Sequence, residues 1–286
     1  MNSLYWSVRR ELWENRSIYL APLVGVCVVL AGFSIGLFTL SSRVRAAASN
    51  PADLHQIVEV PFVMAAIILM GIELVVAIFY CLDALYGERR DRSILFWKSM
   101  PISDLTAVVS KASIPILVIP LMAFVATVVT QVVMLVISGM VLSANGISSS
   151  MVWDQMSLAD IVRINFGHVF AFHGIWYAPL YAWLLLVSAW ATRLPFLWAT
   201  LPPAAIVVIE RVAFNSAHFA GLLQVLFFGF PQADAPSASV MHGMTMEMMA
   251  LPFGQFLLGP GLWIGLVASA VLLLGAARLR RVRTAI

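Results

Sequence analysis

The chain has 286 residues, of which 62% are hydrophobic and only 11% are Asp, Glu, Lys or Arg; its formal net charge is +3. A soluble domain carries about 25% charged residues, and a single aqueous core cannot hide this much apolar surface. The composition therefore excludes an ordinary water-soluble enzyme and predicts an all-α protein that is integral to a membrane. Cys27 and Cys81 lie in apolar stretches and are interpreted as small hydrophobic residues, not as a disulfide or metal pair.

The amino-terminal segment, residues 1–17, predicts an amphipathic helix that lies along the membrane surface. One face carries apolar side chains, aromatic side chains are placed to reach the headgroups, and arginines and glutamates fill the rest. The apolar residues are Leu4, Val8 and Leu12, and the aromatic residues are Tyr5, Trp6 and Trp13. We expect no cleavable signal peptide, since the first apolar run follows this segment and is far longer than a signal sequence needs.

Six apolar runs follow, and about 20 apolar residues suffice to cross the hydrocarbon layer of a membrane. The predicted spans are residues 18–40, 60–82, 112–142, 168–192, 194–209 and 251–277. The fifth is short and contains Pro195, Pro202 and Pro203. The segment 210–250 contains a further apolar patch, 219–230, that is too short for a span, and we expect it to form a re-entrant or interfacial hairpin on the outer side, shielded by protein. Without repeats or linkers, residues 1–286 are taken as one membrane domain.

The placement of the basic residues supports six spans. With an inside amino terminus, thirteen of the 17 Lys and Arg residues fall on one side and four on the other, which is the bias that marks the cytoplasmic side. The four on the outer side are Arg43, Arg45, Arg163 and Arg211. Without the fifth span the basic tail after Ala277 would lie outside, so both termini are expected in the cytoplasm.

The cytoplasmic loop, residues 84–104, is the most informative segment. Alternating charges are followed by Ile94, Leu95, Phe96 and Trp97, and then by a Met-Pro break; Ser103 and Asp104 are expected to cap the next helix. A solvated loop accounts for the charges alone. The large apolar residues favour instead a short amphipathic helix that enters a groove on a cytoplasmic partner.

The pattern ERRDRSILFWKSMPIS, placed after a second span, resembles the cytoplasmic loop of ABC-2 type transporter permeases, and the amphipathic amino terminus and the outer hairpin before the last span fit the same layout. The resemblance implies a homodimer or heterodimer of permeases in the inner (plasma) membrane, each seated on an ATP-hydrolysing subunit, with export as the direction of transport. The loop would be the ATPase-coupling element. Its residues would be Glu88, Arg89, Arg90, Arg92, Phe96, Trp97 and Lys98.

A nucleotide site of the chain's own is not expected. A phosphate-binding loop needs two glycines followed by a lysine and a hydroxyl residue, and the nearest approach, Gly254 to Gly259, is followed by Pro260 with no lysine. ATP and Mg²⁺ would therefore be held by the partner subunit, and no nucleic acid is expected to bind.

Polar residues inside the spans are candidates for a translocation path. Glu73 is the one carboxylate deep in a predicted span, where an ionisable group is costly. It would either take part in gating or cation recognition, or be protonated or hydrogen-bonded and fix helix packing. The other candidates follow helical spacing and are equally consistent with packing between helices or at the interface: Tyr80, Thr127, Gln131, His173, Tyr177 and Tyr181.

Metal binding is not expected within the spans, because His168 and His173 are five residues apart and do not share a helix face. The run Met241–Met249 offers thioethers and an imidazole that suit Cu(I), with Met241, His242, Met244 and Met246 as the ligands, but an amphipathic Met-rich hairpin is the more frequent explanation.

Three classes of function remain open: a transport subunit, an intramembrane enzyme, and a non-catalytic scaffold or channel subunit. An enzyme would need paired catalytic groups at matched depth, and a channel would need a repeated filter. The spans show neither pattern, so the permease subunit is the leading hypothesis.

Overall fold

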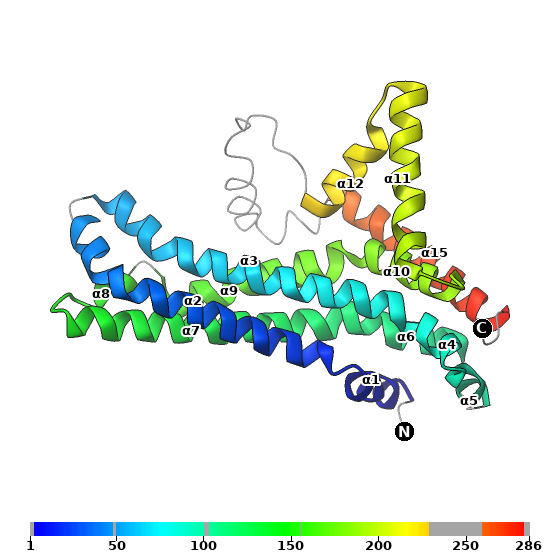
Figure 1. Cartoon of the computed structure of the whole chain (residues 1–286), viewed down its shortest axis with the longest axis horizontal. Helices are drawn as coiled ribbons and strands as arrows, with labels where there is room; N and C mark the ends of the chain where they lie inside the picture. Colours follow the sequence, from blue (N-terminus) through cyan, green and yellow to red (C-terminus); the bar gives the residue numbers. More distant parts are fainter. Residues whose placement is uncertain (1–2, 48–49, 100–102, 155, 229–258, 283–286) are drawn as a thin grey trace. The chain divides into compact units, whose positions relative to one another are not determined.

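A computed structural model describes residues 3–47, 50–99, 103–154, 156–228 and 259–282, and over these residues it contains helices and no β-strand (Figure 1). The α-helices are α1 (Ser3–Glu14), α2 (Ser17–Ala47), α3 (Pro51–Ala84), α4 (Tyr86–Arg90), α5 (Ser93–Ser99), α6 (Asp104–Ser113), α7 (Ile119–Ala144), α8 (Ser150–Trp153), α9 (Leu158–His168), α10 (Ala178–Trp190), α11 (Pro195–Phe214), α12 (His218–Phe228) and α15 (Pro260–Val282). Two π-helical segments, η1 (Ile114–Val118) and η2 (Val169–Trp176), join α6 to α7 and α9 to α10.

Six stretches of helix within the described residues are long and apolar enough to cross a membrane, which confirms a multi-pass, all-α membrane protein. They are Ser17–Ala47, Asp53–Arg90, Asp104–Ala144, Ser150–Trp190, Pro195–Phe214 and Pro260–Val282. The proline-rich fifth stretch is helical over 20 residues. Its first proline occupies the first turn, where a missing N–H costs nothing.

Several helices extend beyond the predicted spans. The third stretch begins at Asp104, not at residue 112, because Ser103 accepts a hydrogen bond from the backbone N–H of Thr106 and caps α6 as predicted. Much of the stretch 143–167, between the third and fourth predicted spans, is also helical, since it contains α8 and most of α9. The apolar runs therefore marked the membrane-crossing portion of each helix and missed its more polar extensions. The first part of the predicted sixth span, 251–258, lies outside the described residues.

The helices divide into two compact units, and each draws on separate stretches of the chain. Unit 1 comprises residues 1–15, 77–118 and 170–286, and unit 2 comprises residues 16–76 and 119–169. Helix α3 passes from one unit to the other between Val76 and Ala77. Each unit therefore brings together residues that are far apart in sequence.

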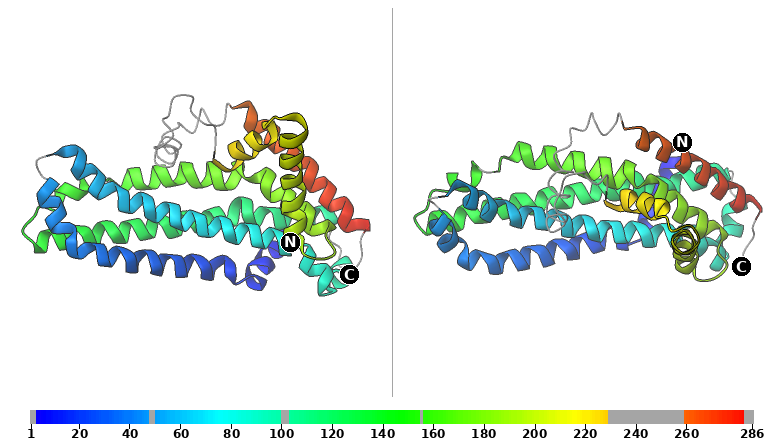
Figure 2. Two further views of the ribbon diagram at one scale, coloured as in Figure 1. Left: turned by 45° about the horizontal axis from the view of Figure 1, so that its top comes forward. Right: turned by 90° about the horizontal axis from the view of Figure 1, so that it is seen from above.

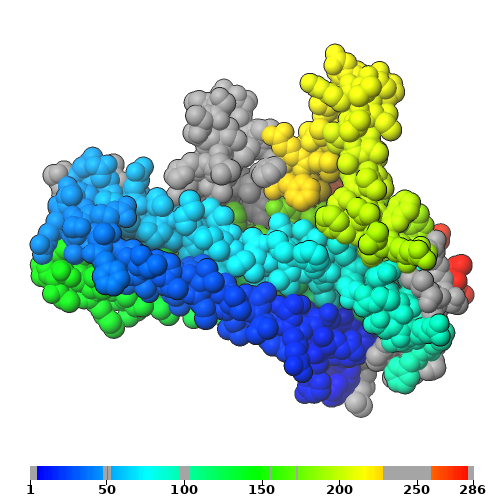
Figure 3. All heavy atoms as spheres, viewed as in Figure 1, coloured from blue at the N-terminus to red at the C-terminus, as the bar shows by residue number. Residues whose placement is uncertain are grey.

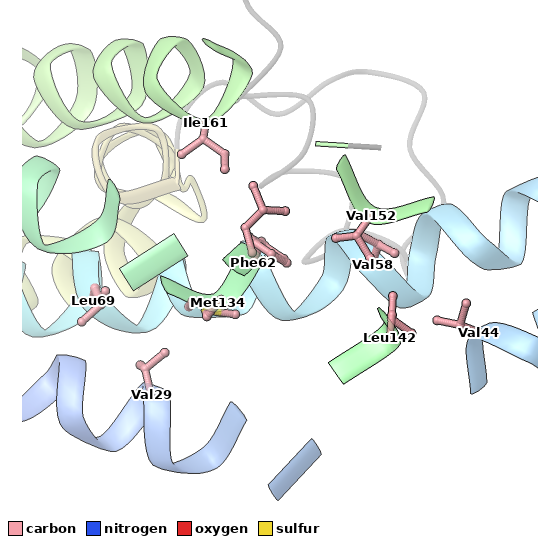
Figure 4. Packing of buried hydrophobic residues seen from close by; sticks show 11 residues of the cluster. Val29, Val44, Val58, Phe62, Leu69, Met134, Leu142, Val152 and Ile161 are labelled. Carbon is pink, nitrogen blue, oxygen red and sulfur yellow. The ribbon is translucent and has the colours of Figure 1, made fainter. Parts of the chain in front are cut away.

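Unit 2 is built on α2, the first part of α3, and α7 to α9. Figure 4 shows its core, in which Val29, Phe62, Leu69 and Met134 lie among the buried apolar side chains. Gly25 lets α2 approach α3 closely, because a Cβ at this position would lie 2.7 Å from Cδ1 of Ile72. The unit is thus a tightly packed helical layer.

Unit 1 is organised around α10 and α15, which pack along each other (Figure 2). Small residues permit this contact: a Cβ at Gly265 would lie 3.1 Å from Pro179, and one at Gly275 would lie 3.3 Å from Leu186. Helix α11, yellow in Figure 3, projects from the rest of this unit and exposes most of its apolar side chains. Within unit 1 the closely packed part therefore lies around α1, α4, α6, α10 and α15.

Candidate functional site

The site begins with α1, whose two faces differ sharply. Tyr5, Trp6 and Trp13 are exposed, and the guanidinium of Arg9 lies over both indole rings, 5.3 Å and 4.9 Å from their centroids. Glu11, in contrast, is only 1% exposed. The helix therefore turns an aromatic and basic surface outward and places one carboxylate inside unit 1.

Glu11 is paired on the inside of unit 1. Its Oε1 accepts a hydrogen bond from Nζ of Lys111 on α6 at 2.9 Å, and its Oε2 accepts one from the hydroxyl of Tyr80 at 3.0 Å. Arg10 also forms an ion pair with Glu11. These contacts join α1 to α6 and to the end of α3.

Glu88 on α4 is the second buried carboxylate. Its Oε1 lies 3.2 Å from Nζ of Lys111 and 3.4 Å from Arg10, and its Oε2 lies 3.1 Å from Nη2 of Arg280 on α15. Arg280 reaches with its other terminal nitrogen to Oδ1 of Asp104, at 2.6 Å. We call this set, Arg10, Glu11, Glu88, Asp104, Lys111 and Arg280, the ion network. It ties α4 to α1, α6 and α15.

The network is balanced in charge, with three carboxylates and three cations. Burial acts to raise the pKa of Glu11, but the neighbouring Lys111 and Arg10 outweigh it and the net shift is downward. Glu11 is accordingly ionised at neutral pH. A polar cavity of about 20 Å³, room for roughly one water molecule, lies beside the network and is lined in part by Ser7, Arg10 and Ser110.

Arg89, the neighbour of Glu88, is also buried and anchors α4 to α10. One of its terminal nitrogens donates to the backbone carbonyls of Ser188, at 2.8 Å, and Ala191. The hydroxyl of Ser188 donates to the carbonyl of Leu82 and accepts from the N–H groups of Leu85 and Tyr86. These bonds satisfy backbone groups at the break between α3 and α4, which would otherwise lack partners inside the protein.

The residues that follow α4 are mostly exposed at the surface of the protein. Arg92 adopts a left-handed conformation (φ 57°), which is uncommon for a residue with a side chain, and it separates α4 from α5. On α5, Ile94 is buried, but Leu95 and Phe96 are 57% and 60% exposed. The predicted coupling residues therefore fall into two groups. Glu88 and Arg89 are internal, whereas Arg90, Arg92 and Phe96 are exposed; the side chains of Trp97 and Lys98 lie outside the described residues.

The candidate path residues of unit 2 are buried. Nε2 of Gln131 donates to the carbonyl of Phe62, and Nδ2 of Asn165 donates to Oε1 of Gln131 at 2.6 Å. Thr127 lies one turn from Gln131, and Glu73 lies on α3. Both residues are buried, and their side-chain oxygens have no hydrogen-bond partner. Gln131 thus acts as a bridge between helices, while Glu73 and Thr127 have unsatisfied oxygens.

Three of the four candidate path residues of unit 1, His173, Tyr177 and Tyr181, form a row. The rings of His173 and Tyr177 meet edge to face at 5.5 Å, and those of Tyr177 and Tyr181 at 6.3 Å. The hydroxyl of Tyr177 donates to the carbonyl of Phe227. Tyr80, by contrast, directs its hydroxyl to Glu11.

Helix α12 is held at both ends by side chains of unit 1. At its start, Glu210 accepts hydrogen bonds from the backbone N–H groups of His218, at 2.7 Å, and Phe219, at 2.8 Å. At its other end, Nε1 of Trp176 donates to the carbonyl of Leu226 at 2.9 Å, beside the bond from Tyr177 to Phe227. The unpaired backbone groups that every helix end leaves are thereby partly satisfied.

Among the described residues, no three His, Cys, Asp or Glu side chains lie close enough to hold a metal ion. The candidate copper ligands Met241, His242, Met244 and Met246 lie outside the described residues.

Sequence reasoning missed most of the ion network. The sequence marks Lys111 and Arg280 only as basic residues near the ends of spans. It marks Asp104 only as part of a helix cap, and Glu11 only as part of a polar helix face. Their pairing joins positions as far apart as Glu88 and Arg280, and local spacing carries no signal for it.

No family model, curated protein or solved structure matches this chain.

Proposed function

We propose that this chain is the permease subunit of an ATP-driven transporter of the ABC-2 type, an exporter that receives its energy from a separate ATPase subunit. One observation carries the proposal: α5 exposes Leu95 and Phe96, while the adjoining α4 is fastened by Glu88 and Arg89 to four other helices. An exposed apolar helix next to a firmly bound one suits an element that contacts a partner and transmits the partner's movement to the other helices.

The anchoring matters because a flexible loop would absorb the movement of a partner. Glu88 contacts α1, α6 and α15 through ion pairs, and Arg89 contacts α10 through backbone carbonyls. Removing one partner of a buried ion pair lowers the stability of a protein by about 3–5 kcal/mol. If a partner displaces α5 and α4, breaking these contacts would therefore cost more than moving the contacted helices along with α4. We expect α1, α6, α10 and α15 to move together with it.

The other predicted elements fit the proposal. The exposed aromatic and basic face of α1 suits the headgroup layer of the inner leaflet, where indole rings and arginine are favoured. Helix α12, at 11 residues, is too short to span a membrane, and capping at both ends by protein side chains is what a re-entrant helix requires in lipid. We accordingly place both termini in the cytoplasm, the α11–α12 hairpin toward the outer side, and a second permease copy or paralogue beside this chain.

The proposal is tested by co-purification. Full-length tagged protein, extracted from native membranes, is expected to bring down a soluble ATPase subunit. Replacement of Phe96 and Trp97 by Ala should abolish this association, because it removes the apolar side chains that would enter the partner's groove. The recovered ATPase is quantified by mass spectrometry.

The control is Phe38→Ala, which removes a phenyl group from α2 that is even more exposed than Phe96, at 88%. This variant should retain the ATPase. Membrane insertion should be normal in both variants. If wild-type protein recovers no ATPase, or if the Phe96 and Trp97 replacement leaves the association unchanged, the proposed function is wrong.

A further inference from the structure

Glu73 is a carboxyl group without a partner in the middle of a membrane-spanning helix. It is 1% exposed, and neither Oε1 nor Oε2 has a hydrogen-bond partner. The helices pack closely next to it, since Ile72 lies against Gly25 of α2. The carboxyl is therefore enclosed by protein and receives no hydrogen bond that would stabilise a negative charge.

Glu73 forms no ion pair with the neighbouring elements of unit 2, whose charged and titratable groups can be named in turn. Helix α7 contains no Asp, Glu, Lys, Arg or His, and neither does α2 between Ile18 and Ser42; beyond that stretch α2 carries Arg43 and Arg45 at its far end. Helix α8 has no charged residue. Helix α9 carries His168 and an exposed ion pair between Asp160 and Arg163. The earlier part of α3 carries Asp53, His55 and Glu59, the last two paired with each other at 2.8 Å.

Glu11 provides a comparison within the same chain. It is as deeply buried as Glu73, at 1% exposed, but it has Lys111, Arg10 and Tyr80 as partners. An unpaired ionised carboxylate in an apolar interior is so costly that the group takes up a proton instead, whereas a paired one stays charged. Equal burial and different surroundings therefore predict a neutral carboxyl at Glu73 and a negatively charged one at Glu11.

We propose that Glu73 is a proton-binding site of the membrane domain, whose carboxyl carries a proton in this conformation and exchanges it with water when the surrounding helices open. The site takes a proton as its ligand and releases it as the carboxyl becomes hydrated. This goes beyond the proposed function and does not depend on the ATPase partner, so it can fail while co-purification succeeds.

Infrared spectroscopy of the full-length protein in lipid vesicles tests the proposal. At neutral pH the wild type should show the carbonyl stretch of a protonated carboxylic acid. The band should be absent in Glu73→Gln and retained in Glu11→Gln, and it should shift after prolonged transfer to D₂O. A band that persists in Glu73→Gln, or one that never shifts in D₂O, would overturn the proposal.

Labelling with dicyclohexylcarbodiimide decides the question if Glu73→Gln does not accumulate. The acid proton passes to a nitrogen of the reagent, the carboxylate oxygen bonds to its central carbon, and an acyl shift to nitrogen leaves a stable N-acylurea that retains every reagent atom. Mass spectrometry should find this addition on the wild-type peptide with Glu73 and not on that with Glu11. An unmodified Glu73, or equal modification of both, would overturn the proposal.

Discussion

Glu11 holds α1 to the rest of unit 1 through the negative charge of its carboxylate, and this charge is lost when the carboxylate is protonated at low pH. Because Lys111 and Arg10 lower its pKa in the folded state despite burial, its stabilisation is fully present above the ordinary carboxyl pKa of 4.5 and is lost as the pH falls through the lower folded value. We expect the thermal unfolding temperature of the detergent-solubilised protein to fall below about pH 4.5. Glu11→Gln removes one partner of a buried ion pair, so it should cost about 3–5 kcal/mol at neutral pH and flatten this acid-side dependence. An unchanged dependence in the variant would contradict the assignment.

Ser188 supports the break between α3 and α4 with a single hydroxyl. It is fully buried, and it makes hydrogen bonds with the backbone of Leu82, Leu85 and Tyr86. Ser188→Ala leaves one buried and one half-buried N–H group without this acceptor, and we expect a loss of about 2 kcal/mol in the free energy of unfolding, measured by denaturant titration. Ser34→Ala is the matched control, since Ser34 is exposed and bonds only to its own helix; its effect should stay within about 0.5 kcal/mol.

At the scale of elements, α12 depends on a cap that comes from α11. Helix α11 ends at Asn215 in a left-handed conformation (φ 46°), which reverses the chain and brings the start of α12 to Glu210. Glu210→Ala removes the acceptor of two N–H groups. We expect severalfold faster amide hydrogen exchange at His218 and Phe219, followed by mass spectrometry of the peptic fragments.

Arg211→Ala is the control for this change, because it removes the neighbouring charge and leaves the cap in place. Exchange in α12 should then stay at the wild-type rate. Equal acceleration in both variants would show that local charge, and not the cap, determines the stability of this helix.

The elements also show how far sequence reasoning reaches. Apolar runs predicted all six spans, and Ser103 predicted the start of α6, because both signals are local. The positions of Glu88 and Arg89 inside unit 1 could not be predicted from the charged loop, since their partners Arg280 and Ser188 lie about a hundred or more residues away. The pattern of charges could not separate residues that anchor the loop from those, such as Phe96, that face outward.

At the scale of the whole molecule, the ion network constrains topology as well as structure. It gathers the end of α1, α4, α6 and the end of α15, so these parts of unit 1 are expected to lie at one level with respect to the membrane. Thirteen of the 17 basic residues belong to the side predicted to hold these ends. From the positive-inside bias we expect that level at the cytoplasmic face.

Cysteine accessibility in intact cells tests this topology. After Cys27 and Cys81 are replaced by Ser, single cysteines at exposed or half-buried positions between the spans are challenged with a membrane-impermeant maleimide. A cysteine at Phe96 should react only after the membrane is opened, because its loop lies inside, whereas one at Asn145 or Ser216 should react in intact cells. Reaction of the Phe96 position in intact cells would reverse the orientation.

Protection of the Ser216 position, with Asn145 reactive, would show that α11 does not cross the membrane, and the basic end of α15 would then have to lie outside. That result would conflict with the contacts of Arg280 to Glu88 and Asp104, since α4 and the start of α6 are expected at the inner face.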